Sequence, residues 1–495
     1  MEIKVLGGKD EIGGNKILLE HKDTRIFLDF GMSFKQASKY FSEFLQPRKC
    51  AGLSDFFELG LLPDIEGLYR GDYLRHMGRD KEERSIDAVF LSHAHADHAN
   101  YIHFLRFDIP IYCTRISKTI MQCLEETGSN PLSDFITACE AFQFYENKKG
   151  GLSRVTRRNK DYVHERDFKI MEPETKVQIK NLEVEMLPVD HSLPGACGYI
   201  VYSDEGNLVY TGDIRFHGSK ANQSRRFVEK AKSVKPKWLL CEGTIIDSRK
   251  KDSEETVKER ITELIGASKG LVFVEFPARD LDRANSIFQS AGASNREFVV
   301  NMKLAYLLAA LGDDAPFSID SIKILVPKKS WGLICKPGFD CKLVEKDYST
   351  WEREFISRDN AVTCDDLCQD PLKYVVSMNM WEMNQLTDIK PENALWIKSS
   401  CDPFCDEMEL DEERKKNWLE HFNIKHYSTH ASGHASGEEI REMIDLINPK
   451  ILIPIHTEDS KVFCQRARAK LKSNRLINKN MVKIENSIVF LSVTV

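Results

Sequence analysis

The sequence predicts an α/β protein built from two α/β units, one inserted into the other. In residues 1–247, short apolar runs alternate with turns and end at polar residues, which is typical of strands that feed functional loops. In residues 248–426 the pattern changes to strands and helices in alternation, which indicates a separate α/β unit. In residues 427–495 the first pattern returns, so we expect both ends of the chain to build one domain.

The strands of the first unit are expected where an apolar run stops close to a residue that can bind a ligand. Side chains on the loops that leave a rigid sheet are well placed to form a site. Five runs have this form: Arg25–Leu28 before Asp29, Ile86–Leu91 before His93, Val184–Val189 before His191, Leu208–Thr211 before Asp213, and Trp238–Cys241 before Glu242.

The inserted unit is expected to open with an amphipathic helix over Asp252–Ala267, which Asp252 and Glu255 would cap as a pair. A further helix is expected over Met302–Leu311, between apolar runs that are typical of buried strands. The expected strands are Leu271–Phe276, Glu297–Val300, Ile324–Val326, Tyr374–Ser377 and Ala394–Lys398.

The returning segment carries a helix over Gly437–Ile447, for which Ser436 and Glu439 form a capping box, and a strand over Ile451–Ile455. His434 therefore stands just before a helix N-terminus, where free backbone N–H groups and the helix dipole favour a phosphate. Small neighbouring residues would let the phosphate approach. The candidate phosphate-binding residues are Ser432, Gly433, His434, Ala435 and Ser436.

Composition indicates an ordinary globular protein of about two domains. The 495 residues are 42% hydrophobic and 29% charged, without a secretory signal or an apolar stretch long enough to cross a membrane. The 13 cysteines show no dense spacing, so we expect reduced thiols and a cytoplasmic protein. The pairs Cys364/Cys368 and Cys401/Cys405 have three residues between them, and we interpret them as ordinary thiols rather than a structural zinc site.

The net charge of −6 argues against a protein that coats nucleic acid through a generally basic surface. Any contact with nucleic acid is then local, and for each basic patch a merely solvated face is the more frequent explanation. The two candidate patches are Lys148, Lys149, Arg154, Arg157, Arg158 and Lys160, and Arg215, Lys220, Arg225 and Arg226.

The densest chemical signal is the segment from Leu91 to Ala99, which holds three histidines and an aspartate within six residues after an apolar run. Core packing does not require such a cluster, whereas neutral imidazoles and a carboxylate are suitable ligands for zinc. A loop leaving a strand can direct His93 and His95 to one ion and Asp97 and His98 to a neighbouring one.

This pattern resembles the metallo-β-lactamase superfamily, and Asp29, His191 and Asp213 match its further motifs in order. The resemblance implies an αββα sandwich with two zinc ions, manganese being the alternative, which together can activate a hydroxide for phosphodiester hydrolysis. Asp29 would orient the ligands from behind. The implied ligand sets are His93, His95, His191 and Asp213 for one ion, and Asp97, His98, Asp213 and His456 for the other.

The inserted unit narrows the resemblance to the β-CASP nucleases, in which two motif histidines follow the insertion. Glu242, His434 and His456 match the motifs of that group. By resemblance His434 protonates the leaving 3′ oxygen and Glu242 holds its ring, so the candidate catalytic residues are Asp97, Glu242 and His434. A histidine at the position of His456 accompanies RNA processing in this group, whereas DNA-repair members tend to have valine.

Within the β-CASP group the chain is similar to the ribonuclease J family, in the stretch from Gly7 to Asn15, in Leu62–Ile65 and in Ser432–Ser436. In that family the last of these segments receives an RNA phosphate. Three departures are present. Lys35–Leu61 lengthens the path between two motifs, a threonine follows Glu242-Gly where a serine is expected, and few residues follow His456, so the oligomeric state stays open.

We therefore expect an RNA hydrolase that acts on single-stranded RNA, as a 5′-to-3′ exonuclease, an endonuclease or both, and leaves 5′-phosphate and 3′-hydroxyl ends. A DNA nuclease of repair is the first alternative, and a preference for single-stranded DNA would identify it. A hydrolase of small esters needs neither the insertion nor His434, and a catalytically inactive scaffold needs no complete ligand set. A homo-oligomer is compatible with each of these.

Overall fold

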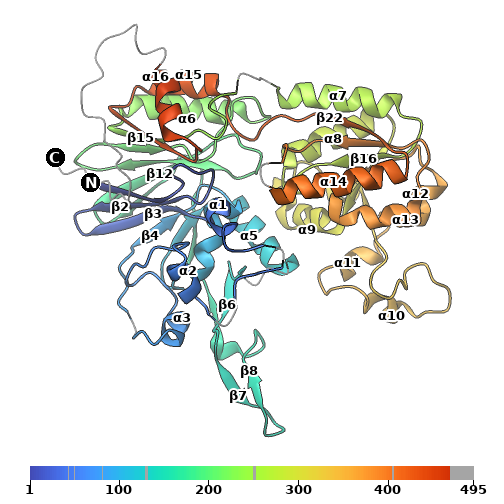
Figure 1. Cartoon of the computed structure of the whole chain (residues 1–495), viewed down its shortest axis with the longest axis horizontal. Coiled ribbons are helices and arrows are strands. Elements are labelled where there is room, and N and C mark those ends of the chain that lie inside the picture. Colours follow the sequence, from blue (N-terminus) through green and yellow to red (C-terminus); the bar gives the residue numbers. More distant parts are fainter. Residues whose placement is uncertain are drawn as a thin grey trace.

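The computed structural model describes residues 1–42, 44–48, 51–80, 82–128, 132–248, 252–403 and 406–468. Two six-stranded sheets pack face to face and a seven-stranded sheet lies beside them (Figure 1). Both expected α/β units are therefore present, and the predicted sandwich fold is confirmed. In the described part of the chain, helices with the length and apolar character needed to cross a membrane are absent.

The first sheet has the order β1-β2-β3-β4-β5-β10, and the second has the order β11-β12-β13-β14-β15-β23. The strands of the first are Glu2–Gly7, Lys16–His21, Thr24–Phe30, Ala88–Phe90, Ile111–Cys113 and Phe168–Ile170. Those of the second are Lys176–Ile179, Leu182–Pro188, Cys197–Tyr202, Leu208–Tyr210, Trp238–Glu242 and Ile451–Ile455.

The core of the sandwich lies between these sheets, where Leu28 and Phe90 of the first sheet join Tyr199 and Trp238 of the second in one buried cluster. Helices α6 (Ala221–Ser233), α15 (Gly437–Ile447) and α16 (Ser460–Arg468) cover the outer face of the second sheet. The outer face of the first sheet is covered by α2 (Ser54–Glu58), α3 (Gly71–His76), α4 (Ala96–Ala99) and α5 (Arg115–Thr127).

The third sheet is parallel throughout, with the order β19-β18-β17-β20-β16-β21-β22. Its strands in chain order are Val272–Glu275, Glu297–Asn301, Lys323–Leu325, Ala361–Val362, Tyr374–Ser377, Leu395–Lys398 and Lys425–Ser428. Its main helices are α7 (Glu254–Ala267), α8 (Leu281–Ala293), α9 (Met302–Leu311), α12 (Cys364–Gln369) and α14 (Asp406–His421).

The division into residues 1–247, 248–426 and 427–495 stays a prediction, and β22 runs across the second of these limits. The first helix of the insertion differs at its start, because Ser253, rather than Asp252, caps α7 by accepting a hydrogen bond from the Thr256 amide. Ser253 has the extended backbone that an N-cap needs, so the helix begins two residues later than predicted.

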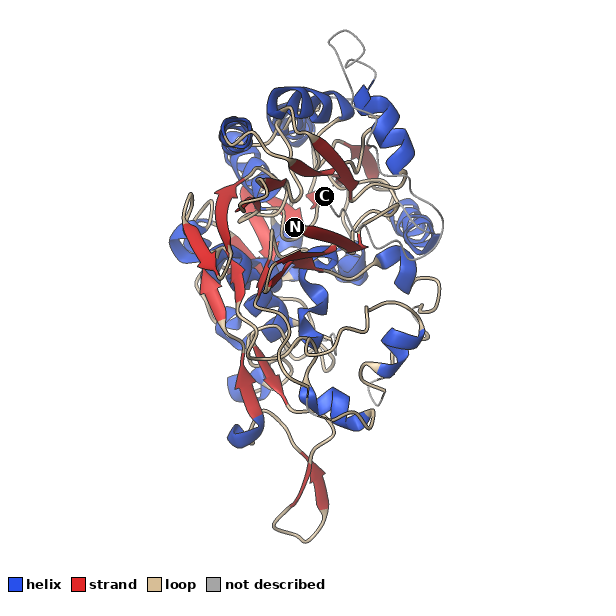
Figure 2. Cartoon of the chain, turned by 90° about the vertical axis from the view of Figure 1, so that its left-hand side faces the viewer, coloured by secondary structure: helices blue, strands red, loops and turns tan. Residues whose placement is uncertain are grey.

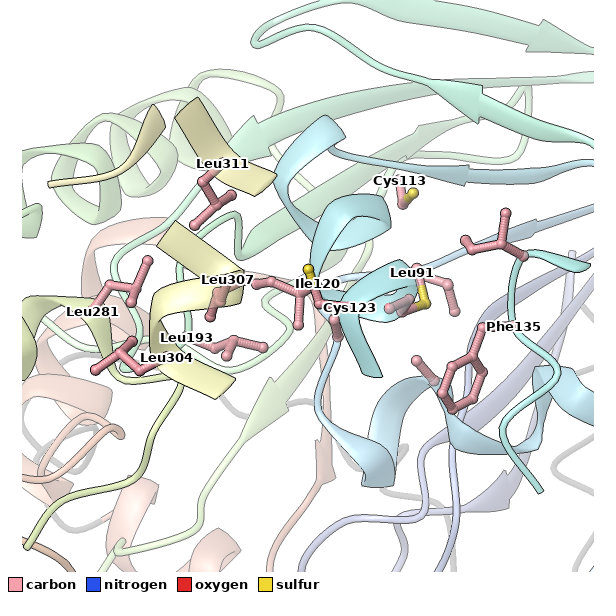
Figure 3. Packing of buried hydrophobic residues seen from close by; sticks show 14 of the residues in the cluster. Leu91, Cys113, Ile120, Cys123, Phe135, Leu193, Leu281, Leu304, Leu307 and Leu311 are labelled. Carbon is pink, nitrogen blue, oxygen red and sulfur yellow. The ribbon is translucent and has the colours of Figure 1, made fainter. Parts of the chain in front are cut away.

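The two units are joined by an apolar contact between α5 and α9. Ile120 and Cys123 of α5 face Leu304 and Leu307 of α9 in one buried cluster (Figure 3). Leu193 lies in the same cluster, two residues after His191, so this contact also holds the loop that carries a candidate ligand.

A hairpin of β7 (Phe144–Glu146) and β8 (Leu152–Arg154) extends away from the sandwich (Figure 2). We call it the finger. It carries part of the first basic patch, including the exposed Lys148 and Lys149. The second patch is wrong in one member, because Arg215 is fully buried and bonds two carboxylates, Asp190 and Asp282.

The remaining features are the path from Lys35 to Leu61, the cysteine pairs and the short elements. In the described part of the path from Lys35 to Leu61, Leu53 and Phe56 are buried in the cluster that covers the first sheet. Cys364 is buried and Cys368 exposed, both are free thiols, and Cys405 lies outside the described residues. Short elements are α1 (Phe34–Ala37), β6 (Thr137–Cys139), β9 (Val163–Glu165), α10 (Cys341–Glu345), α11 (Arg353–Ile356) and α13 (Leu386–Ile389).

Candidate metal centre

The histidine-rich loop leaves β4 and ends in the single turn α4, with His95 at the helix N-cap. The glycine-rich N-terminal loop packs directly against it. The Asn15 amide donates to the Asp97 carbonyl over 3.0 Å, and a Cβ atom on Gly31 would lie 1.7 Å from that oxygen. A Cβ on Gly13 would meet the Asp97 side chain at 2.5 Å, so glycine at both positions permits the close approach.

The first expected ligand set converges on one point. His93 Nε2 lies 2.9 Å from His95 Nδ1, and His191 Nε2 lies 3.2 Å from the same atom. Asp213 Oδ2 is 3.6 Å from His93 Nε2 and 3.7 Å from His191 Nε2. All four donor atoms lie within 4.8 Å of one another, a spacing at which they can bind a common ion.

The second expected set gathers on the other side of Asp213. His456 Nε2 is 3.1 Å from Asp97 Oδ2 and 3.7 Å from Asp213 Oδ1. His98 Nε2 is 3.2 Å from Asp213 Oδ2, so each carboxylate oxygen of Asp213 is within 4 Å of a histidine of this set. The structure thus brings together all seven residues predicted as ligands, with Asp213 between the two groups.

The donors fit a metal ion, because two of them are buried polar atoms without a hydrogen-bond partner in the described chain: His98 Nε2 and Asp213 Oδ1. Burial lowers the pKa of His93 and of His191, and lowers that of His95 to about 4, so these rings are neutral and can donate lone pairs. Neutral imidazoles with carboxylates are typical zinc ligands.

The far sides of the His93, His98 and His191 rings are held by further hydrogen bonds. Asp29 accepts from His98 Nδ1 over 2.7 Å and from the hydroxyl of Ser92, which itself lies 3.0 Å from His93 Nδ1. His191 Nδ1 donates to the Gly433 carbonyl over 2.6 Å. With Nδ1 as donor, the Nε2 lone pairs of these rings point into the cluster, which is how outer partners orient metal ligands.

Glu242, at the end of β15, and His434 form a third group at the edge of the cluster. His434 Nδ1 lies 3.0 Å from Glu242 Oε2, and the Ile214 amide donates to Glu242 Oε1 over 2.8 Å. Burial lowers the pKa of His434, but the carboxylates of Glu242 and Asp213 raise it to about 9, so the ring holds a proton. Asp213, Glu242, His434 and His456 are also close enough to hold an ion.

Thr244 is a site residue that sequence reasoning did not identify. Its hydroxyl donates to Glu242 Oε2 over 2.8 Å and lies 2.8 Å from His456 Nδ1 and 3.1 Å from His434 Nδ1. The threonine noted as a departure from the family pattern therefore joins a candidate ligand to the candidate proton donor. A serine would supply the same hydroxyl.

We expect Thr244→Val to lower the rate of substrate cleavage about tenfold, the range found when a partner of a metal ligand is removed. The isosteric methyl group keeps the packing but no longer accepts from His456 or donates to Glu242. Thr244→Ser is the matched control and should retain near wild-type activity. Steady-state kinetics of the two variants decide this, and equal losses would show that only packing matters at this position.

The phosphate-binding segment differs from the prediction in its available donors. The Ser436–Glu439 capping box is present, yet the N–H groups around the helix start already have acceptors. Ala435 N donates to Ile214 O over 2.7 Å, Ser436 N to Glu439 Oε2 over 2.8 Å, and Gly437 N to Ser248 O over 3.3 Å. Within the described chain, the amides of Ser432 and Gly433 are left for a phosphate.

Comparisons with known proteins agree with this geometry. Residues 63–252 match the family described as "Beta-lactamase superfamily domain". Residues 421–481 match the family described as "Zn-dependent metallo-hydrolase RNA specificity domain". The first match contains His93, His191 and Glu242, and the second contains His434 and His456, so the two matches meet at the candidate metal centre.

Ribonuclease J proteins are similar along most of the chain. That of Mycoplasma genitalium is 24% identical and covers 92% of this chain and 68% of its own length. That of Pyrococcus abyssi is 22% identical and covers 92% of this chain and 90% of its own. A protein of unknown function from Enterococcus faecalis V583 shares the fold, with a TM-score of 0.66, 23% identity and coverage of 93% of this chain and 94% of that one.

Proposed function

We propose that this chain, which belongs to the metallo-β-lactamase superfamily and is similar to ribonuclease J over 92% of its length, is a two-metal ribonuclease. The observation that carries the proposal is the double ligand cluster around Asp213 with His434 beside it. Hydrolysis of a phosphodiester needs an activated water and a proton donor, and this arrangement offers both.

Each residue of the site has a proposed role in metal binding or proton transfer. His93, His95, His191 and Asp213 would hold one zinc ion, and Asp97, His98, Asp213 and His456 the second, with manganese as the alternative. Bound metal ions supply a nucleophilic hydroxide and stabilise negative charge on the phosphate. His434 donates a proton to the leaving 3′ oxygen from Nε2, because Nδ1 is directed to Glu242. The products are then a 5′-phosphate and a 3′-hydroxyl.

Single-stranded RNA is the proposed substrate, in the cytoplasm. RNA is favoured because His456 occupies the motif position that accompanies RNA processing, and because the matched relatives are ribonucleases. The Ser432–Ser436 segment would bind an RNA phosphate through the Ser432 and Gly433 amides. All cysteines in the described segments are free thiols, which agrees with a reducing compartment.

The deciding experiment compares matched single-stranded RNA and DNA oligonucleotides that carry a 5′-monophosphate, a 5′-hydroxyl or a 5′-triphosphate. We expect zinc- or manganese-loaded protein to release mononucleotides from 5′-monophosphate RNA, and chelation with EDTA to abolish the release. Internal cuts that ignore the 5′ end would assign an endonuclease. Faster cleavage of DNA would replace this proposal by a repair nuclease, and inactivity on every oligonucleotide would favour a hydrolase of small esters.

A further inference from the structure

The carboxyl-terminal edge of the seven-stranded sheet faces the candidate metal centre. All its strands are parallel, so the loops after β16, β21 and β22 leave from one edge. Arg215 bonds Asp282, in the first turn of α8, over 2.7 Å, and Arg283 lies 3.4 Å from the carbonyl of Ala431, in the loop that leads to His434. In open parallel sheets this edge is where ligands bind.

Two tryptophans stand exposed along this edge. Trp381, which follows β20, is 76% exposed, and Trp331, which follows β18, is 61% exposed. The other four of the six tryptophans are buried or half-buried. The exposed two have fixed backbones, because the Trp381 amide donates to Asn379 over 2.9 Å and the Trp331 amide to Asp347 over 3.1 Å. Exposed rings on anchored backbone are suited to stack against a flat partner.

Arg279 lies at the same edge, in the turn between β16 and α8. It is half-buried and has neither a hydrogen bond nor an ion pair among the described residues. The turn lies against the loop that leads to His434, because Asp282 and Arg283, three and four residues further on, contact Arg215 and the Ala431 carbonyl. A partly exposed guanidinium without a hydrogen bond or ion pair can bind an incoming phosphate.

The strand order places the loops that carry these three residues one after another along the edge. β16 is next to β20, and β18 lies beyond β17, so the row runs from Arg279 past Trp381 to Trp331. We propose that this row is the path of the single-stranded substrate, with Arg279 on a backbone phosphate next to the metal centre and bases stacked on Trp381 and then on Trp331. The assignment of RNA to this path rests on the proposed function.

The chemistry favours a single strand over a protein partner. Every base has a flat face, so aromatic platforms accept any sequence, as a general ribonuclease requires. A planar guanidinium matches two phosphate oxygens at once. The path also ends at His434 and the ligand cluster, so a strand that follows it delivers a phosphodiester to the reacting groups.

Binding tests the stacking step. A fluorescein-labelled 12-mer of phosphorothioate-linked RNA, which resists cleavage, is titrated into metal-loaded protein and followed by anisotropy. We expect Trp381→Ala to raise the Kd for this RNA about tenfold. Trp331→Ala should weaken binding of the 12-mer but leave unchanged the binding of a 4-mer, which is too short to reach Trp331. Phe144→Ala, at a 63% exposed aromatic on the finger, is the matched control. Wild-type affinity in both tryptophan variants, or an equal loss in Phe144→Ala, overturns the path.

Salt dependence tests the phosphate contact. Arg279→Gln should reduce the slope of log Kd against log salt concentration by about 0.7, the value for one phosphate contact of a single strand, while metal content stays unchanged. An unchanged slope overturns the role of Arg279. Failure of this path is separable from failure of the proposed function. If the protein cleaves RNA but the tryptophan variants bind RNA as wild type does, only the path is refuted. If RNA binding depends on the tryptophans but no RNA is cleaved, only the ribonuclease activity is refuted.

Discussion

Asp213→Ala is expected to release metal from both clusters and to abolish cleavage. Asp213 is the residue shared by the two expected ligand sets, with Oδ2 3.2 Å from His98 and Oδ1 3.7 Å from His456. Its removal takes a charged donor from each ion at once, so metal affinity should fall by more than about 100-fold, the upper limit for loss of an outer partner. Metal content of the dialysed protein, measured by mass spectrometry, checks this.

The matched control is Asp204→Ala, which removes an exposed carboxylate that pairs with Lys22 far from the cluster and should keep the metal. Loss of one ion with retention of the other would show that Asp213 serves a single site. Full retention would contradict the shared carboxylate, and would place the metals on other donors of the cluster. Circular dichroism of the variant excludes unfolding as the cause of metal loss.

The parts of this molecule that follow from local signals could be predicted residue by residue. The helix Gly437–Ile447 and the strand Ile451–Ile455 have the predicted bounds, because a capping box and an apolar spacing are written within a few residues. The candidate ligands could also be chosen from the sequence, since they stand in motifs at the ends of apolar runs, and the structure brings them together, although their role as ligands stays a prediction. Strand β22 could not be predicted, because all four of its residues are exposed and lack an apolar alternation.

Contacts between segments that are distant in the chain could not be predicted from the sequence. Thr244 has a role because its hydroxyl lies beside His434 and His456, about two hundred positions away in the sequence. These residues come together when β23 pairs with β15. The N–H groups at the start of α15 looked free because their acceptors, Ile214 O and Ser248 O, belong to other loops. Asp29 and His456 both have positive φ angles, 57° and 49°, a strain that only the assembled site explains.

A second large effect is expected for His434→Ala, which should keep both metals and slow RNA cleavage by about a hundredfold or more. His434 belongs to neither expected ligand set, and its partner is Glu242, at 3.0 Å. Its loss removes the proton donor for the 3′ oxygen and leaves the ligands in place. His426→Ala, at an exposed histidine of β22, is the matched control and should behave as wild type.

The leaving group separates proton donation from every other role of His434. In a phosphodiester with a nitrophenolate leaving group, that group departs without protonation. We therefore expect His434→Ala to cleave this substrate at close to the wild-type rate while RNA cleavage is lost. Equal losses on both substrates would assign His434 to substrate positioning. Loss of metal would instead assign it to the group of Asp213, Glu242 and His456, whose donor atoms lie close enough to hold an ion with it. A general acid is therefore established only when RNA cleavage falls and both metal content and nitrophenyl ester hydrolysis persist.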